Sequence, residues 1–487
     1  MQFPFGPLAP DAKETAPGVV MTAQNVLPLI EGYGPMQRLV AAASAAALPA
    51  NPRGLISLVQ RNGAYQVFGF TETTIQEMQA DYTWVETASG LSCTAGDDWS
   101  AVHFGDQLLA TNTTDGLKAY NVELGGSVSA IADAGAPRSV FSCANVVVGL
   151  DTLDNSGTRN NRLIRTSAFG DHTNWKTKGA DYQPLDDGQE LICGVSLKNN
   201  AAVVFQADAM RLMQFGNAGG GATFSLQSIA DGRGAVGERS VVSFDGVCYF
   251  LASNGFWKFS MNGLAPIGSG KVDQWFFDNV EISRLSEVQG SVDPSRKMVW
   301  WRFPSTTIGE SVIFEDMIGY SWEFDRWVTA KVNTSYLSRI ATPGYTLDSM
   351  DGFGALDSID IPLDSRFWAG GAPLFAAINA DLKFATFSAG ALAPLIQSRT
   401  ANSPVSGLLT SCTPLTDAAN CTVALGVSDK LSDALTWKAA SSVKPSGRVP
   451  LRGRGKNVAF RWANAQDEEW EYVKGIDHIG ASAGGVR

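Results

Sequence analysis

One short pattern recurs along this chain: an apolar run of strand length, a polar turn containing Asn-Gly or Asp-Gly, and another apolar run. It is most compact in SFDGVCYFLASNGFWKFSMNG, which contains Asp245-Gly246, Asn254-Gly255 and Asn262-Gly263. Asn or Asp followed by Gly tolerates positive φ at both centres of a type I′ hairpin turn. The pattern therefore predicts an antiparallel meander with a tight turn at each pair.

Both faces of this meander are apolar. Val247, Tyr249 and Leu251 alternate onto one face of the expected strand, because side-chain direction in a strand has a period of two. Cys248 and Phe250 fall on the other face. A sheet with two apolar faces must be covered on both sides, so we expect it to lie between neighbouring sheets.

The same order of strands and turns recurs in GLISLVQRNGAYQVFGF, AVHFGDQLLATNTTDGLKAYNV, GVSLKNNAAVVFQADAMRLMQF and SVVSFDGVCYFLASNGFWKFSM. Small sheets that are apolar on both faces bury them by packing around a ring. We therefore predict an all-β fold, with a β-propeller of antiparallel meander blades over residues 49–390. Helical periodicity is weak, and the segment TTIQEMQADYTW leaves helix and strand open.

Two segments flank the repeats. Residues 1–48 are rich in Pro, Gly and Ala, and FPFGPLAP favours extended geometry, so we expect an N-terminal arm that lies on something else. Its apolar side chains need a cover in a neighbouring subunit or the ring above; the candidate assembly interface is Phe3, Phe5, Pro7, Tyr33 and Pro35. Deleting the arm should then lower assembly without unfolding the propeller. Residues 391–487 read as strands of a C-terminal β-sheet domain or a closing blade.

Composition narrows the functional classes. The net charge is −11, which argues against a protein that grips nucleic acid, because such binding relies on Lys and Arg at phosphates. The six cysteines are scattered without a Cys-x-x-Cys pair and there are three histidines, so we expect no zinc site and small buried cysteines. No secretion signal or membrane-spanning run is present, which predicts a soluble protein without membrane insertion, made in a reducing cytoplasm.

Motifs for chemistry are weak. GSGKV has Ala265 where a phosphate-binding loop needs Gly and Val272 where it needs Ser or Thr, so we expect a plain turn and no bound cofactor. DTLDNSG, beginning at Asp151, resembles a calcium loop only in composition, and Asx turns explain it better. His103, His172 and the remaining histidine lie near acids, but no nucleophile signature accompanies them. Carboxylate pairs converge only in the fold, so a glycan hydrolase stays open.

The stretch NRLIRTSAFGDHTNWKT places a Gly-Asp turn between a strand and a tryptophan. Gly170 and Asp171 form the expected Asx-type turn, and Trp175 is expected to return its ring to the sheet. We interpret Gly170, Asp171 and Trp175 as a structural hinge and not as a catalytic site.

Taken in order, several of these segments resemble the tail hub or nozzle proteins of short-tailed bacteriophages, also called tail or packaged-DNA stabilisation proteins. The resemblance covers most of residues 3 to 330 and is carried by FPFGPLAPD, AQNVLPLIEGYGPM, WSAVHFGDQLLATNTTDGLKAYNV, NRLIRTSAFGDHTNW, YQPLDDGQELICGVSLKNNAAVVFQADAMRLMQF, GVCYFLASNGFWKFSMNGLAPIGSGKVDQWFF and VDPSRKMVWWRFP. The closing EEWEYVKGIDHIGASAGGVR also resembles the end of such chains. The region from about Ala341 to Ala391 matches no pattern of that family.

This resemblance implies a structural protein of the virion tail and no enzyme activity. It implies a β-propeller with extra domains that assembles as a six-fold ring below the portal and adaptor proteins, with DNA passing through the channel without specific binding. Attachment of a tail fibre or needle stays open. The alternatives are a propeller glycan hydrolase or lyase, which predicts paired carboxylates of raised pKa, and a receptor-binding module, which predicts exposed aromatic residues.

Overall fold

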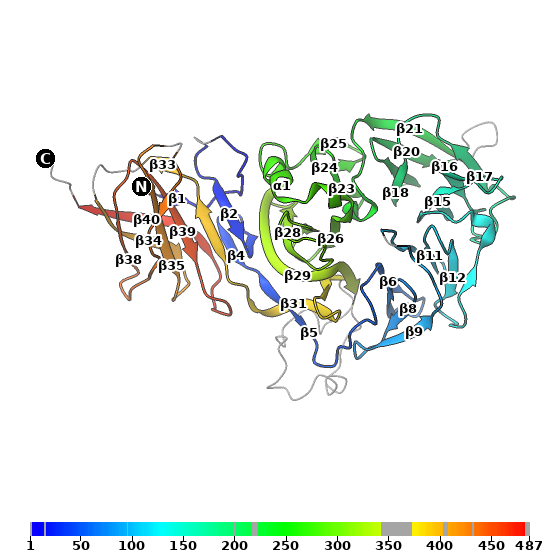
Figure 1. Cartoon of the computed structure of the whole chain (residues 1–487), viewed down its shortest axis with the longest axis horizontal. Coiled ribbons are helices and arrows are strands. Elements are labelled where there is room, and N and C mark those ends of the chain that lie inside the picture. Colours follow the sequence, from blue (N-terminus) through cyan, green and yellow to red (C-terminus); the bar gives the residue numbers. More distant parts are fainter. Residues whose placement is uncertain are drawn as a thin grey trace.

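The chain is almost entirely β structure in the computed structural model (Figure 1). The residues described are 2–13, 16–94, 96–198, 200–216, 223–341, 373–402, 408–430 and 433–482. Within these ranges the helices are α1 (Asp273–Asn279) and the 3-10 turns η1 (Ala132–Ala134), η2 (Glu238–Ser240) and η3 (Ile282–Glu287). None of the helices in the described ranges has the length and apolar run needed to cross a lipid bilayer.

Five separate sheets, here called the first to fifth sheets, each contain four consecutive antiparallel strands. The first sheet contains β6 (Gly54–Val59), β7 (Tyr65–Phe70), β8 (Ile75–Met78) and β9 (Trp84–Ala88), and the second contains β10 (Ser100–Phe104), β11 (Gln107–Thr111), β12 (Lys118–Asn121) and β13 (Ser129–Ala130). The third sheet contains β14 (Ser139–Cys143), β15 (Val146–Leu153), β16 (Arg159–Thr166) and β17 (Asp181–Pro184), and the fourth contains β18 (Leu191–Ser196), β19 (Ala201–Gln206), β20 (Ala209–Phe215) and β21 (Phe224–Asp231). The fifth sheet contains β22 (Val242–Phe244), β23 (Val247–Ala252), β24 (Gly255–Ser260) and β25 (Gly263–Pro266). The segment TTIQEMQADYTW, which left helix and strand open, contains β8 and the start of β9.

A sixth meander follows and belongs to a larger sheet. Its strands are β26 (Gln289–Asp293), β27 (Met298–Phe303), β28 (Phe314–Ser321) and β29 (Arg326–Ala341). The first strands of successive sheets contact one another from β6 through β10 and β14 to β18 and again from β22 to β26, and β29 returns to contact β6. Figure 1 shows the six meanders arranged about a common centre.

Buried side chains fill the spaces between neighbouring sheets. Phe205 of the fourth sheet and Phe250 of the fifth meet edge to face, with ring centroids 5.0 Å apart. On the opposite face of the fifth sheet, Leu251 is fully buried in a separate core cluster. The prediction that this meander is covered on both faces is therefore confirmed.

The predicted turns are right at one pair and shifted at two. Asp245 and Gly246 have φ of 51° and 81°, as a type I′ turn requires. Gly255 and Gly263 instead begin β24 and β25, so both turns lie one residue earlier than predicted. At Gly255 the reason is packing: a Cβ there would lie 2.3 Å from the Asp273 carboxylate, so only glycine fits.

The C-terminal part forms two β layers, and not one separate sheet. The larger sheet runs on from β29 and takes in β30 (Pro373–Asn379), β31 (Phe384–Ala391), β32 (Leu395–Ser398), β33 (Ala401–Asn402), β35 (Thr422–Ser428), β36 (Thr436–Trp437), β37 (Ser441–Ser442) and β39 (Asn457–Ala463). The second layer contains β34 (Leu408–Thr416), β38 (Val449–Gly453) and β40 (Val473–Ser482). Residues 342–372, in the region without family resemblance, lie outside the described residues.

The N-terminal segment is woven into both layers. It supplies β1 (Phe3–Pro4), β2 (Val20–Gln24), β3 (Val26–Pro28), β4 (Tyr33–Pro35) and β5 (Gln37–Ala41). Strand β2 lies between β29 of the sixth meander and β32 of the C-terminal part, while β1 pairs with β40. The expected arm that lies on another molecule is therefore corrected: this segment joins the two halves of its own chain.

Candidate functional site

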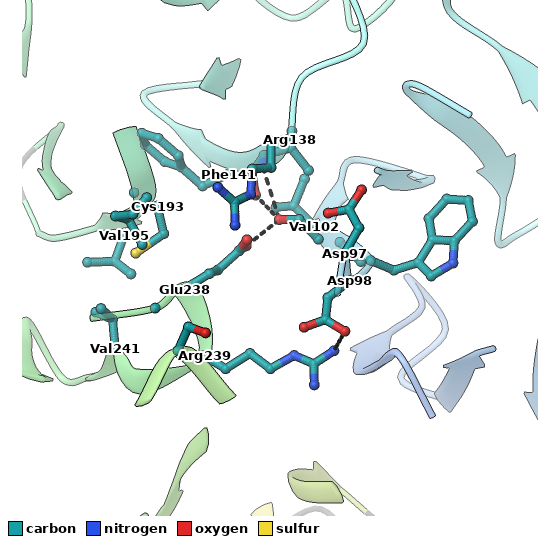
Figure 2. Close-up of a pocket in the computed structure, with 18 of the residues that line it drawn as sticks. Asp97, Asp98, Val102, Arg138, Phe141, Cys193, Val195, Glu238, Arg239 and Val241 are labelled. Atoms are coloured by element: carbon teal, nitrogen blue, oxygen red, sulfur yellow. Dashed lines mark hydrogen bonds and ion pairs between the residues drawn. The ribbon is translucent and has the colours of Figure 1, made fainter. Parts of the chain in front are cut away.

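A cavity of about 620 Å³ lies where the sheets meet at their common centre (Figure 2). Its walls come from the first strands of the five sheets, from the segments that lead into them and from η3, with Tyr336 of β29 on one side. Charged side chains are concentrated in the lining, namely Asp97, Asp98, Arg138, Glu190, Glu238, Arg239 and Glu287. These seven charged side chains meet at the centre of the six meanders, and this cavity is our candidate site.

A repeated sequence pattern builds the inner wall. Three first strands, β10, β14 and β22, begin within WSAV, RSVF and RSVV, in which a serine follows Trp or Arg and precedes two apolar residues. The serines, Ser100, Ser139 and Ser240, are all buried. The apolar residues pack between sheets while each serine hydroxyl makes a hydrogen bond near the centre.

Glu238 extends into this wall from η2, ahead of the fifth sheet. Its Oε1 accepts hydrogen bonds from Ser100 Oγ at 2.6 Å and from Ser139 Oγ at 3.0 Å. Burial raises the pKa of Glu238, and these two hydroxyls and the nearby Arg138 oppose that rise. One carboxylate from the fifth sheet thus holds the starts of the second and third sheets together.

The next residue, Arg239, makes the matching contact to the first two sheets. Its Nη2 lies 2.5 Å from Asp98 Oδ1 and donates to the carbonyl of Arg53 at 2.5 Å, and its guanidinium lies 4.9 Å from the centroid of the Tyr336 ring. Burial raises the pKa of Asp98, and the positive charges of Arg239 and Arg53 counteract it. Glu238 and Arg239 together therefore connect the fifth sheet to the first three.

A second buried cation lies behind this wall. Arg302 donates from Nη1 to the carbonyl of Thr334 at 2.6 Å, and its guanidinium lies 4.5 Å from the centroid of the Phe314 ring. Burial, together with the like charge of Arg239, lowers the pKa of Arg302 to about 9. Positive charge is thus held near the central acids even though the chain as a whole is acidic.

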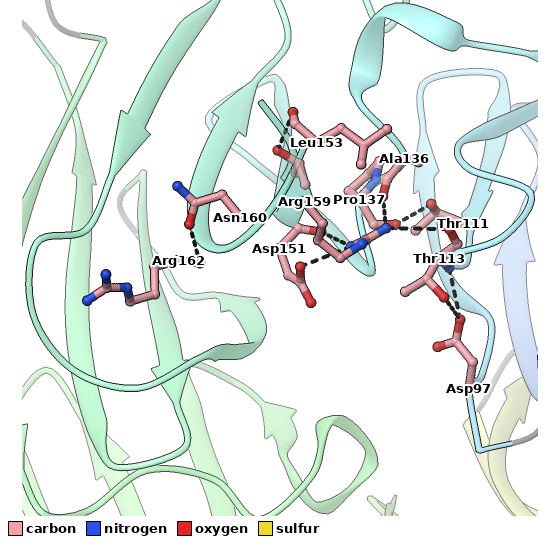
Figure 3. Close-up of polar contacts among 11 residues, drawn as sticks. Asp97, Thr111, Thr113, Ala136, Pro137, Asp151, Leu153, Arg159, Asn160 and Arg162 are labelled. Carbon is pink, nitrogen blue, oxygen red and sulfur yellow. Dashed lines mark hydrogen bonds and ion pairs between the residues drawn. The ribbon is translucent and has the colours of Figure 1, made fainter. Parts of the chain in front are cut away.

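Arg159 fastens the second sheet to the third (Figure 3). Its Nη1 lies 2.9 Å from Asp151 Oδ1, and its Nη2 donates to the carbonyl of Ala136 at 2.9 Å and to that of Thr113, between β11 and β12, at 3.4 Å. Close by, Thr111 Oγ1 donates to the carbonyl of Pro137 at 2.5 Å. Asp151 is the first acid of DTLDNSG, so this carboxylate already has a partner within the chain.

The second acid of that loop makes an Asx turn. Asp154 Oδ1 accepts from the backbone N–H of Ser156 at 2.8 Å and from that of Thr158 at 2.9 Å. A hydrogen bond from the Ser156 hydroxyl, at 2.6 Å, and these backbone bonds lower the pKa of Asp154. The loop thus has the Asx-turn geometry expected from its sequence.

The hinge residues lie together in the connection between β16 and β17. Gly170 has a φ of 68°, Asp171 Oδ1 accepts from the backbone N–H of Thr173 at 3.0 Å, and Trp175 is 3% exposed. The Trp175 ring packs with residues of the second sheet, and its Nε1 donates to the carbonyl of His172 at 2.8 Å. The turn is therefore anchored to a neighbouring sheet by one buried ring.

The residues predicted to form an assembly interface lie mainly in the core of their own chain. Phe3, Phe5 and Tyr33 are 6%, 1% and 0% exposed, whereas Pro35 is half-buried and Pro7 is exposed. The apolar rings do need a cover, as expected, but strands of the same chain provide it. Phe3, Phe5 and Tyr33 are therefore withdrawn from the candidate interface.

Arg326 holds this segment in place. Its Nη1 donates to the carbonyls of Leu29 and Gly32 at 2.6 and 2.9 Å, and its Nη2 donates to that of Phe5 at 3.2 Å. The guanidinium lies 4.9 Å from the centroid of the Tyr33 ring. Burial raises the pKa of Tyr33 far above its usual value, so this ring stays neutral.

The GSGKV segment leads into α1 without forming a phosphate site. Both backbone N–H groups that a phosphate would use, those of Gln274 and Trp275, donate to the Asp11 carboxylate at 2.7 and 2.9 Å. Lys271 Nζ lies 2.7 Å from Asp325 Oδ2. The Asp11 carboxylate, in the N-terminal segment, thus occupies the position that a bound phosphate would take.

The six cysteines are buried free thiols, as expected for small apolar residues. Burial raises the pKa of Cys93, Cys248 and Cys412 to about 12, so these thiols stay protonated.

No known family model matches this chain. No curated protein matches its sequence.

The central residues Asp98, Glu238 and Arg239 were not among those singled out from sequence. The signal that could have found them is the Ser-apolar-apolar pattern shared by three sheets, because charged residues precede the serine in each. Their convergence depends on the order of the sheets around the centre, which local pattern does not specify.

Proposed function

We propose that the six meanders are the blades of a β-propeller, spanning β6 to β29. Each blade has four antiparallel strands, the first strands face the shared cavity, and β29 meets β6 to complete the circuit. Propellers bury two-faced sheets in this way without leaving long open edges. The C-terminal layers and the N-terminal segment then form a second unit attached beside the sixth blade.

We further propose that the protein is a structural subunit of the tail of a short-tailed bacteriophage. In this view six copies form the nozzle or hub ring below the portal and adaptor proteins and line the path for DNA ejection. The co-linear sequence resemblance over residues 3 to 330 points to the virion tail. The pairing of β2 with β29 and β32, which joins the meanders to a second unit, supports a part built from a propeller with extra domains.

The observation that supports a structural function is that two central carboxylates have partners within the chain. The Glu238 carboxylate accepts hydrogen bonds from two serine hydroxyls, and the Asp98 carboxylate forms an ion pair with Arg239. These contacts join the fifth blade to the first three, so they stabilise the closed disc. A tail protein that must withstand the passage of DNA would be stabilised by such contacts between its blades.

DNA would pass between the copies and not through one propeller. The central cavity, about 620 Å³, has the size of a small-molecule pocket, and its walls are held together by direct contacts. A channel formed by several copies of a chain with net charge −11 offers few anchors for phosphate, so DNA would slide. Replacing channel acids with Lys should slow ejection, and an unchanged ejection rate would count against this route.

Binding to the portal tests the proposal directly. The purified chain is mixed with the portal–adaptor complex of the same phage and sedimented, with the portal lacking its adaptor as the control. We expect the chain to sediment with the complete complex and not with the control. A chain that never joins the complex would contradict a function in the tail.

One observation favours a second candidate, a hydrolase or lyase acting on host polysaccharide. Asp98 and Glu238 line the same cavity, and burial raises the pKa of both, as it does for carboxyls that act as general acids. The test is release of reducing sugar from host polysaccharide. Activity that Glu238→Gln abolishes would favour the enzyme over the structural function.

A further inference from the structure

The edge of the second C-terminal layer carries a row of positive charge. Strand β38 pairs with β34 alone among the described strands, and alternate residues of β38 point outward. Side chains on one face of a strand repeat roughly every 6.6 Å. The cations on the last part of β38 and directly after it, here called the basic edge, are Arg452, Arg454 and Lys456.

These cations have no counter-charges within the part of the chain that the structure describes. All three side chains are exposed, and none makes an ion pair with a described residue. In a chain of net charge −11, three cations within five residues and no acid among them are a marked local excess. Such an excess attracts an acidic surface.

An acidic groove lies elsewhere in the same half of the molecule. It has a volume of about 760 Å³, with Phe375 and Phe387 among its walls. The loop DEEWE, which follows β39, supplies Glu469 and Glu471, both exposed and without a hydrogen-bond or ionic partner for their carboxylates among the described residues. Trp470 between them is 6% exposed, and its Nε1 has no hydrogen-bond partner in the described structure.

The two surfaces lie at opposite ends of one strand. Arg454 and Lys456 lie within three residues before β39, which begins at Asn457, and the acidic loop begins four residues after its last residue, Ala463. A strand of this length spans roughly 20 Å. The basic edge and the acidic groove of one copy are therefore too far apart to neutralise each other.

We infer that the basic edge of one copy docks on the acidic groove of a second copy. This inference rests on the proposed ring and identifies the surfaces that build it. Two complementary patches at opposite ends of a domain make a heterologous, head-to-tail contact, and such contacts form a ring when the rotation from one copy to the next closes. The groove also offers an apolar floor for Pro450, which is exposed on the incoming edge strand, or for the stems of its arginines.

Charge reversal tests each surface separately. One variant is Arg452→Glu with Arg454→Glu, and the other is Glu469→Lys with Glu471→Lys. The control, Lys176→Glu with Lys178→Glu, changes charge equally on an exposed loop of the third sheet. Mass is measured by light scattering at low and high salt, alone and on the portal–adaptor complex.

We expect the wild-type chain to self-associate in at least one of these settings, and more weakly at high salt, because salt screens exposed charges. Each reversal should weaken association at least tenfold, and the control should not. An equimolar mixture of the two reversed variants should regain assembly, because it contains both a native and a doubly reversed contact. A misfolded variant could not regain assembly in this way.

The remaining outcomes distinguish an error in the two assigned surfaces from an error in the proposed ring. If the wild-type chain forms rings that both reversals leave intact, the surfaces are wrongly assigned and the ring stands. If the wild-type chain is monomeric in both settings, the ring itself is wrong. If Arg452→Glu with Arg454→Glu leaves rings intact but abolishes binding of a fluorescent DNA duplex, the basic edge is a nucleic-acid surface instead.

Discussion

Arg239 Nη2 lies 2.5 Å from Asp98 Oδ1, so the entry to the fifth sheet is bonded to the entry to the second across the common centre. The side chains are 17% and 39% exposed, which places the pair at the rim of the cavity and not in a dry core. This contact joins segments about 140 residues apart in the sequence and thereby links two sheets of the circuit. The stability of the disc should therefore be sensitive to this pair.

Arg239→Ala should lower the free energy of unfolding by about 2 kcal/mol. Removing one partner of a buried pair costs about 3–5 kcal/mol, and the exposure of Asp98 to solvent reduces that figure. Urea unfolding at neutral pH measures the change.

The matched control is Lys176→Ala. Its ion pair with Asp133 is 2.5 Å long but lies on the surface, with side chains 63% and 50% exposed. Exposed pairs contribute about 0–1 kcal/mol, so this variant should unfold nearly as the wild type does. Equal destabilisation by both variants would mean that the ion pair of Arg239 with Asp98 adds no more to the stability of the fold than a surface ion pair does.

The stability of the protein should depend on pH through Asp273. Burial raises the pKa of Asp273 to about 6, above about 3.9 in an unfolded chain. The folded state therefore favours the protonated form of Asp273. The contribution of this carboxyl to the free energy of unfolding is fully present below about pH 4 and is lost as the pH rises through about 6.

Asp273→Asn isolates that contribution. The amide cannot ionise but keeps an oxygen for the backbone N–H of Phe256, which donates to Asp273 Oδ1 at 3.0 Å. Between about pH 4 and 6 the variant should gain about 1–2 kcal/mol relative to the wild type, measured by urea unfolding at each pH. Parallel pH profiles would show that Asp273 titrates normally.

The buried N-terminal segment should be part of the folded unit. Phe5 is 1% exposed, so Phe5→Ala should cost about 3–5 kcal/mol and lower the melting temperature. Pro7→Ala, two residues away and exposed, is the control and should have little effect. Deleting the segment should likewise destabilise the chain. A truncated chain that unfolds like the wild type would restore the free arm that the sequence suggested.

Trp175 should anchor its loop to the second sheet. Trp175→Ala removes a ring that is 3% exposed and should cost about 3–5 kcal/mol. In the same loop Phe169 is 72% exposed, so Phe169→Ala should change stability by less than about 0.5 kcal/mol. Hydrogen exchange of the loop amides should rise in the first variant alone; similar exchange in both would leave Trp175 without an anchoring role.

The sequence predicted the local β structure well because strand and turn signals are short-range. Alternation and Asx-Gly pairs located the meanders, and Asp245-Gly246 forms the predicted turn. The errors come from tertiary contacts: Gly255 is a glycine because Asp273 lies against it, and not because it forms the turn. Asp11 likewise caps α1, a contact that no local pattern reveals.

The long-range features escaped prediction for the same reason. The apolar rings of Phe3, Phe5 and Tyr33 called for a cover, but sequence alone does not say which molecule supplies it. The pairing of β2 with β29 and β32 decides that question. The central contacts of Glu238 and Arg239 depend in turn on the order in which the sheets meet.

Electron microscopy of the purified chain, alone and with the portal–adaptor complex, tests most directly whether this protein builds a ring. We expect averaged end views with six-fold symmetry, in which each unit is a disc with a second unit at its side. Particles that remain single discs in both samples would contradict a tail-ring subunit and would direct attention to Asp98 and Glu238 as groups that act on a sugar.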